Sequence, residues 1–287
     1  MAVPRGTARD GAEAVRAVLR AVGELVVGPL VDLVLPRTCA GCGVPGAVLC
    51  RACAAGLAAP RLATPRRFPE GFPPTVAAGA YAGRVRPAVV AFKERGRAEL
   101  AGPLGTALAL AAAAVAAGVP GPGPAGIPAP LLLVPVPGSA AALRSRGRDH
   151  VRELAVRAVA ELRAAGVPAG SARLLGRTGR VRDSTGLSAA QRRANLAGTF
   201  TVRAPVPAGA LLVVVDDVVS SGATLTEAAA TLGAARTRPG PPVLAAVVAA
   251  TPRRAPGPGP GPGSGDPPAG CPAPSGSPRR STVGTGG

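Results

Sequence analysis

Aromatic residues are scarce in this sequence, which contains four phenylalanines, one tyrosine and no tryptophan. Proteins that bind single-stranded nucleic acid commonly stack the bases on aromatic rings, so this composition offers few platforms for that mode of binding. Histidine is scarcer still, because His150 is its only instance. A histidine at the start of a helix is more often solvated than catalytic, and we assign no chemistry to it.

Lysine is also limited to one residue, Lys93, in a chain that otherwise uses arginine for its basic side chains. A lysine carries a compact ammonium group, and a site that needs such a group would explain its presence. Chance explains it equally well. Both interpretations stand, and Lys93 is a candidate site residue.

Long apolar runs are missing as well, and with them a clear membrane anchor. The best candidate, residues 21–35, is interrupted by Glu24 and Asp32, so we predict no stable membrane insertion. Asp10 and Glu13 precede this stretch, which is atypical of a secretory signal peptide. We therefore expect a cytoplasmic protein.

Positive charge is abundant. The 287 residues include 33 basic and 15 acidic side chains, which gives a formal net charge of +18, together with 40 glycines and 34 prolines. Such a field attracts polyanions such as nucleic acid at low salt. The arginine bias accompanies a general bias toward alanine, glycine and proline, so charge alone does not identify a partner.

Four of the five cysteines form two C-x-x-C pairs separated by seven residues, namely Cys39, Cys42, Cys50 and Cys53. Two such pairs can place four thiolates tetrahedrally around one Zn²⁺ ion, and Arg37 and Arg51 would offset the negative charge. Disulfides are the alternative, which a cytoplasmic compartment disfavours. We predict a structural zinc knuckle over residues 37–57, because four protein thiolates leave no open position for a substrate.

Apolar runs and helical spacing alternate over residues 75–251, which predicts an α/β fold with a mostly parallel sheet flanked by helices. The predicted strands cover residues 75–81, 131–136, 171–175, 200–206, 211–217 and 242–251. Helices are predicted within 83–116, with a break at Gly96 or Gly102, and over 150–165 and 225–235. An amphipathic helix is predicted within residues 1–36, and the Pro- and Gly-rich residues 252–287 are predicted to be disordered.

The clearest functional signal follows the apolar run 211–215. In an open α/β sheet, ligands bind where the strands end, and a small-residue loop at a helix start can hold a phosphate with its backbone N–H groups. Two carboxylates before such a loop can accept hydrogen bonds from sugar hydroxyls or act as outer partners of Mg²⁺. The predicted pentose-phosphate site consists of Asp216, Asp217, Ser220, Ser221, Gly222, Ala223 and Thr224. The alternative is an ordinary strand, turn and helix cap.

Two arginine-rich segments could meet further phosphate groups. Arg144, Arg146 and Arg148 lie between a predicted strand and the helix that Asp149 can cap, which favours a diphosphate site. The second segment, residues 176–198, is typical of a mobile lid over an anionic ligand. Its arginines are Arg177, Arg180, Arg182, Arg192 and Arg193.

The acidic pair and the loop after it resemble the phosphoribosyl pyrophosphate (PRPP) signature of the type I phosphoribosyltransferases. The wider chain resembles the ComF family, which combines that fold with an N-terminal zinc module. The features that carry this resemblance are the cysteine pairs, Val134-Pro-Val-Pro137, Arg146-Gly147, Arg192 with Asn195, and the acidic-pair loop. Where that family usually has Arg-Gly-aromatic-Asn-Gln, this chain has Arg146-Gly-Arg-Asp-His150.

This resemblance implies that Mg²⁺ and PRPP bind at Asp216 to Thr224 and that Arg144 and Arg146 meet the diphosphate. Catalysis is then expected to depend on Asp216, Asp217, Arg146 and Lys93. It also implies an alternative from another class, a non-catalytic protein that binds single-stranded DNA during DNA uptake. The sequence leaves the acceptor and the oligomeric state open.

Overall fold

The computed structural model describes residues 37–64, 69–119, 129–178 and 198–252. The predicted helix within residues 1–36, the predicted disordered tail from residue 253 onward and residues 179–197 of the predicted lid lie outside the described residues. Four of the five arginines assigned to that lid therefore also lie outside the described residues, and Arg177 is the one that the structure describes.

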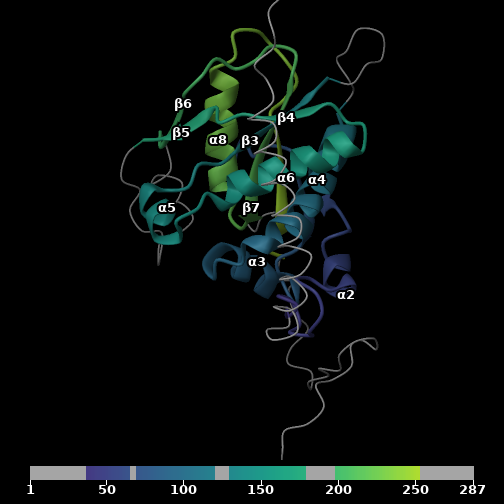
Figure 1. The fold of residues 1–287 in the computed structure, drawn as a ribbon. Helices are drawn as coiled ribbons and strands as arrows, with labels where there is room; N and C mark the ends of the chain where they lie inside the picture. The colour runs from purple at the N-terminus through teal and green to yellow at the C-terminus, as the bar shows by residue number, and fades with distance from the viewer. Residues whose placement is uncertain (1–36, 65–68, 120–128, 179–197, 253–287) are drawn as a thin grey trace, which may run out of the picture.

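A six-stranded mixed sheet, mostly parallel, forms the centre of the described residues (Figure 1). Its strand order is β1-β2-β8-β7-β3-β4. The parallel strands are β2 (Thr75–Ala80), β3 (Leu131–Pro135), β4 (Ala169–Ser171), β7 (Leu211–Val219) and β8 (Leu244–Ala250). The edge strand β1 (Arg61–Leu62) pairs antiparallel with β2. The α/β architecture predicted from the alternating pattern is thus confirmed.

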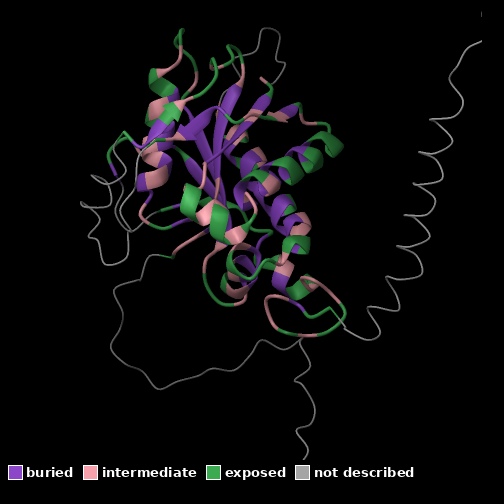
Figure 2. Ribbon diagram, turned by 60° about the vertical axis from the view of Figure 1, so that its left-hand side comes forward, coloured by how far each residue is buried: buried purple, intermediate pink, exposed green. Residues whose placement is uncertain are grey.

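Strand β7 lies in the interior of the sheet and is buried on both faces. Leu211, Val213 and Val215 contact one hydrophobic core, whereas Leu212 and Val214 contact the other. Successive side chains of a strand point to opposite faces, so an unbroken apolar run is what a two-sided core requires. Figure 2 shows the buried strands between helices whose outer surfaces are exposed.

Helices cover both faces of this sheet. One core includes residues of α3 (Val85–Glu94), α4 (Ala101–Ala117) and α6 (His150–Ala164), and the other includes residues of α8 (Ala223–Ala234). Helices α4 and α6 lie side by side (Figure 1). Asp149 caps α6 as predicted, because its Oδ1 accepts the backbone N–H of Arg152 at 3.2 Å.

The stretch Ala98–Ala117 is the one helix among the described residues that is long and apolar enough to cross a membrane by length and composition. It differs from the best candidate that the sequence indicated, residues 21–35, which lies outside the described residues. More than half of this apolar stretch, 56%, is buried inside the protein, because α4 packs against α6 and against strands β2 and β8. Its apolar composition is that of a core helix.

The smaller elements are α2 (Arg51–Ala55), η1 (Ala98–Leu100), α5 (Ala140–Arg146), β5 (Leu175–Arg177) and β6 (Phe200–Val202). Strands β5 and β6 form a separate antiparallel pair. The single strand predicted over residues 171–175 is wrong, since Ser171 ends β4, Leu175 begins β5 and residues 172–174 connect the two. The strand predicted over 200–206 ends at Val202, and Pro205 and Pro207, which have no backbone N–H to pair, follow it.

Candidate functional site

The acidic pair lies inside β7, which continues to Val219 and does not end at the two carboxylates as predicted. Adjacent residues of a strand point to opposite faces. Asp217 accordingly lies on the side of α3 and α6, where it contacts Lys93 and His150 directly, whereas Asp216 makes no such contact among the described residues and interacts through charge with Arg177 of β5 and with Lys93. The two carboxylates therefore have different surroundings.

Asp217 is almost completely enclosed, with 4% of its side chain exposed. Its Oδ2 atom lies 2.9 Å from Lys93 Nζ and 3.1 Å from His150 Nε2. Its Oδ1 atom accepts the backbone N–H of Val218 at 2.7 Å. Both oxygens of this buried carboxylate are therefore engaged by the protein.

The charges of this cluster support one another. Burial alone would raise the pKa of Asp217, but the hydrogen bond from His150 and the charge of Lys93 hold that pKa well below its usual range. Burial alone would lower the pKa of Lys93, but the carboxylate of Asp217 raises it above its ordinary value. Lys93 and Asp217 are thus an ion pair at neutral pH.

Asp216 behaves in the opposite way. Burial, and then the negative charge of Asp217 beside it, raise the pKa of Asp216 to about 8. The backbone N–H of Asp217 donates to Asp216 Oδ1 at 2.8 Å. Asp216 is therefore mostly protonated at neutral pH, and a cation that binds it must displace a proton.

Arg177 lies on the Asp216 side of the sheet. Its Nε atom is buried and has no hydrogen-bond partner among the described residues, and its guanidinium lies 5.6 Å from the centre of the Phe200 ring. Burial lowers its pKa, and the negative charge of Asp216 opposes this shift when that carboxyl group is ionised. The prediction that Arg177 belongs to a mobile lid is wrong, because Arg177 is the last residue of strand β5. A buried donor without a partner is free to bind an anion.

The loop between β7 and α8 closes tightly around Gly222. This glycine has φ of +80°, and a Cβ atom added to it would lie 2.7 Å from Phe72 Cε2. Only glycine fits both the backbone angle and the space. Ser220 is exposed, and Ser221 and Thr224 are half-buried. Helix α8 begins at Ala223, two residues before the predicted start, so the loop residues lie directly at the helix N-terminus.

The arginines of the α5 region differ in their availability. Arg146 pairs with Glu94, with Nη2 lying 3.1 Å from Oε1. Arg148 pairs with Glu153 and stacks over Phe92, with its guanidinium carbon 4.4 Å from the ring centre. Arg144 is exposed. Arg146 lies near enough to Lys93 for its charge to oppose the raised pKa of that lysine, so both belong to one cationic region.

His150 is the candidate site residue that sequence reasoning missed. We expected a solvated side chain at the start of a helix, but His150 is buried and bonded to Asp217. No local sequence signal indicates this contact, because 67 residues separate the two partners. The fact that it is the only histidine was the one available hint.

The four cysteines form the second candidate site. Their Sγ atoms all lie within 4.8 Å of one another, and those of Cys42 and Cys50 are 3.6 Å apart. Four thiolates about 2.3 Å from one Zn²⁺ ion would be about 3.8 Å from each other, so the cluster can bind such a metal after a small contraction. The close approach predicted from the two C-x-x-C pairs is confirmed.

Backbone N–H groups prepare Cys39 for this role. Burial by itself would raise the pKa of Cys39, but hydrogen bonds from the N–H groups of Cys50, Cys42 and Gly41 bring it down to about 6. The Cys50 N–H lies 3.3 Å from the Cys39 sulfur. The thiolate, which is the form that binds metal, is therefore favoured at neutral pH.

The cysteine module packs closely onto the main fold. A Cβ atom added at Gly79 of β2 would lie 2.2 Å from the carbonyl oxygen of Gly56, which caps α2. Arg97 donates from Nη1 to the carbonyl of Thr38 at 2.8 Å, and Leu57 belongs to the core that contains α3 and α4. Residues 37–57 are therefore continuous with the core of the α/β domain.

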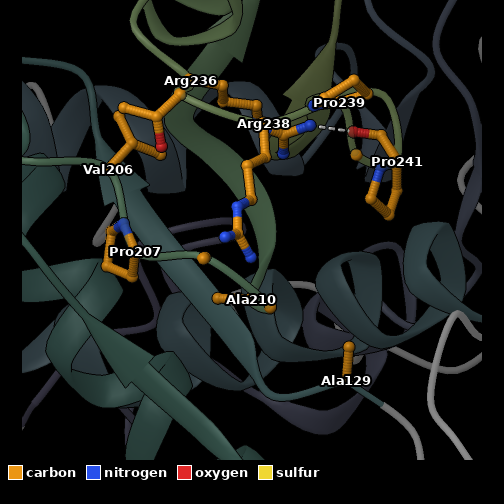
Figure 3. A pocket seen from close by; sticks show the side chains of 12 residues that line it. Ala129, Val206, Pro207, Ala210, Arg236, Arg238, Pro239 and Pro241 are labelled. Carbon is orange, nitrogen blue, oxygen red and sulfur yellow. Dashed lines mark hydrogen bonds between the residues drawn. The ribbon is translucent and has the colours of Figure 1, made fainter.

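Two cavities among the described residues lie away from the acidic pair. One of about 310 Å³ is lined by residues before β3, β7 and β8, among them Ala129, Ala210 and Pro241, at the amino ends of those strands (Figure 3). Another of about 770 Å³ extends from Arg236 to Phe72. Neither is lined by Asp216 or Ser220. We place the candidate site at the carboxyl ends of the strands, because charged groups converge there.

Comparison with models of known protein families and with curated proteins finds no match to this chain. The resemblance to the ComF family and the type I phosphoribosyltransferases therefore stays an expectation, and a functional proposal has to rest on the site.

Proposed function

We propose that this protein is a ComF-like phosphoribosyltransferase that binds PRPP with Mg²⁺ and transfers the phosphoribosyl group to an acceptor, releasing diphosphate. The observation that carries the proposal is the convergence of Asp216, the loop 220–224 and a group of cations at the carboxyl edge of the sheet. The cations are Lys93, Arg146 and Arg177.

Each part of the ligand has a matching group at this edge. The N-terminus of α8 and the serine and threonine hydroxyls of its loop suit a 5-phosphate. Asp216 suits the ribose hydroxyls, and as a carboxylate it suits Mg²⁺ carried by the diphosphate. Lys93 and Arg146, with exposed Arg144 nearby in sequence, suit the diphosphate oxygens.

Charge stabilisation is the main catalytic task in such a transfer. The bond from the ribose C1 to the diphosphate oxygen breaks, a bond from an acceptor nitrogen to C1 forms, and the acceptor proton passes to solvent. Negative charge develops on the leaving diphosphate, and cations fixed in place before the reaction stabilise it. Mg²⁺ would neutralise part of the same charge when bound. Asp217 contributes by holding Lys93.

Isothermal titration of the full chain with Mg²⁺ and PRPP tests the proposal. We expect binding in the wild type and about tenfold weaker binding in Arg144→Ala, which removes one charged donor. Arg238→Ala is the matched control, because it removes an exposed arginine at the opposite edge of the sheet. An absence of heat from the wild type at millimolar PRPP would contradict the proposal.

The zinc in this proposal is structural. The cysteine cluster lies against the core that includes residues of α3, and it offers four protein ligands, which fill a tetrahedral site. Bound zinc would supply no chemistry to the transfer. Zinc would link the turn that the β-bridge between Thr38 and Pro45 closes to helix α2.

A second candidate function is binding of single-stranded DNA. The observation that favours it is the set of exposed arginines on and beside the cysteine module, which includes Arg37, Arg51, Arg86 and Arg95. Affinity for a short oligonucleotide should then fall steeply with salt and weaken after zinc is chelated. Binding that is absent at physiological ionic strength would exclude this function.

A further inference from the structure

Three elements meet through one buried carboxylate. Lys93 lies near the end of α3, His150 is the first residue of α6, and Asp217 lies in β7. Their side chains meet at Asp217 Oδ2, which is 2.9 Å from Lys93 Nζ and 3.1 Å from His150 Nε2. This array, Lys93–Asp217–His150, joins two helices to the central sheet where we place the ligand.

The direction of the histidine hydrogen bond follows from charge. Asp217 is ionised, because the Lys93 ammonium lies 2.9 Å from its Oδ2 atom and the Val218 N–H donates to its Oδ1 atom, and an ionised carboxylate can only accept hydrogen bonds. His150 therefore carries a proton on Nε2 and donates it to Oδ2. Oδ1 is occupied by the Val218 N–H, so the carboxylate cannot rotate without losing a bond.

Exposure differs along the array. The side chains of Asp217 and His150 are 4% and 7% exposed, whereas that of Lys93 is 32% exposed. An ammonium group has three donors, and Asp217 engages one side of it. Lys93 is thus the member of the array that can reach a ligand, and the other two lie behind it.

The histidine is itself held in place. The Phe92 ring meets the His150 ring edge to face, with centroids 6.2 Å apart and an interplanar angle of 66°. The Arg148 guanidinium lies over the Phe92 ring, and its Nη1 atom donates to the Phe92 carbonyl oxygen at 3.3 Å. Packing therefore fixes the imidazole, and the imidazole fixes the carboxylate.

We infer that His150 is a positioning residue that acts through Asp217 to aim the Lys93 ammonium at the anionic part of the ligand. The inference rests on the proposed function for the kind of ligand, an organic diphosphate. The array itself is independent of that proposal. Loss of the Nε2 donor leaves the buried carboxylate with an unfilled position, so the ion pair loses its fixed geometry.

The composition of the chain makes this inference directly measurable. Lys93 is the only lysine and His150 the only histidine, so selective ¹⁵N labelling of lysine gives a single side-chain ammonium signal in the full chain. An anchored ammonium exchanges slowly with water and gives a sharp signal, whereas a free lysine does not.

His150→Leu removes the donor, and His150→Gln keeps a donor at about the same place. We expect His150→Leu to convert the Lys93 signal to that of a free lysine and to weaken binding of inorganic diphosphate about tenfold, as the loss of one charge-assisted bond would. His150→Gln should retain both the anchored Lys93 signal and the wild-type affinity for diphosphate. A Lys93 signal that His150→Leu leaves unchanged, or that both variants change equally, would overturn the inference.

Asp217→Asn keeps the experiment decisive if His150→Leu does not fold. The negative charge of Asp217 raises the pKa of Lys93, so the titration of Lys93 should move to lower pH in this variant. An unchanged titration would exclude the array. Failure of wild-type protein to bind diphosphate or PRPP, with the Lys93 signal behaving as expected, would contradict the proposed function and leave the positioning role standing.

Discussion

The cysteine cluster and the acidic edge of the sheet are assembled in opposite ways. The four cysteines lie within 15 residues of one another, and local turns bring their sulfurs together. The acidic edge combines residues from α3, α6, β5 and β7, some more than 100 residues apart. The first site is a property of a short segment, whereas the second exists only when the whole domain is folded.

The largest expected effect is the loss of the cysteine cluster. Cys39→Ser should abolish zinc binding and unfold residues 37–57, because the metal supplies about 10 kcal/mol or more to small zinc modules. Metal analysis and thermal unfolding measure this. Cys271→Ser is the matched control, since it removes the one cysteine outside the two pairs. Normal zinc content in Cys39→Ser would show that the cluster is not the zinc site.

Gly222→Ala should destabilise the protein by about 1–3 kcal/mol, since the new Cβ meets Phe72 and the backbone angle is strained. Gly209→Ala is a matched control, because Gly209 has the same φ of +80° but nothing lies within 4 Å of an added Cβ. Urea unfolding of both variants separates strain from collision. Equal losses would mean that Phe72 moves away at no cost.

Asp216 and Asp217 should contribute to the free energy of unfolding with opposite pH dependence. The pKa of Asp216 is raised to about 8, so the folded state holds its proton more tightly and the free energy of unfolding falls as pH rises from about 4 to about 8. Asp216→Asn should remove this fall and gain at least about 1.4 kcal/mol at pH 9, the worth of one pKa unit.

The pKa of Asp217 is lowered, so its contribution is present at neutral pH and is lost as pH falls below about 4. Denaturant unfolding across pH 3–9 tests both signs, and a wild-type stability that stays level from pH 4 to pH 9 would contradict the Asp216 assignment.

The smallest expected effect concerns Arg146. Its partner Glu94 is half exposed, at 50% of its side chain, and exposed ion pairs contribute little. Glu94→Gln should therefore change the free energy of unfolding by less than about 0.5 kcal/mol, while it releases Arg146 for ligand and tightens diphosphate binding slightly. Weaker binding in Glu94→Gln would show that Glu94 orients Arg146 for the ligand.

Much of the fold was predictable from local patterns. The unbroken apolar run at 211–215 predicted a doubly buried strand, and it alternates between the two cores as such a strand must. The helical spacing after residue 150 and the cap at Asp149 were also correct. The single strand predicted over 171–175 was wrong, because a stretch of five residues is too short for its pattern to separate one strand from the ends of two strands and their connection.

The candidate site was predictable only as a set of parts. Asp216 and Asp217 are adjacent in the sequence, and the prediction assigned both the same role, as hydrogen-bond acceptors for one ligand. The structure separates them, since β7 continues through both and points one to each face. In this geometry Asp217 contacts Lys93 and His150 directly, whereas Asp216 interacts with Lys93 and Arg177 only through charge.

The sequence by itself therefore determined the cysteine cluster, the α/β alternation and the loop that begins α8, because each depends on neighbours along the chain. Tertiary structure decided which charges meet, that His150 is buried, and that two adjacent carboxylates hold different protonation states at neutral pH. The physical reason is that burial and distant partners, not residue type, set the free energy of a charge inside a protein.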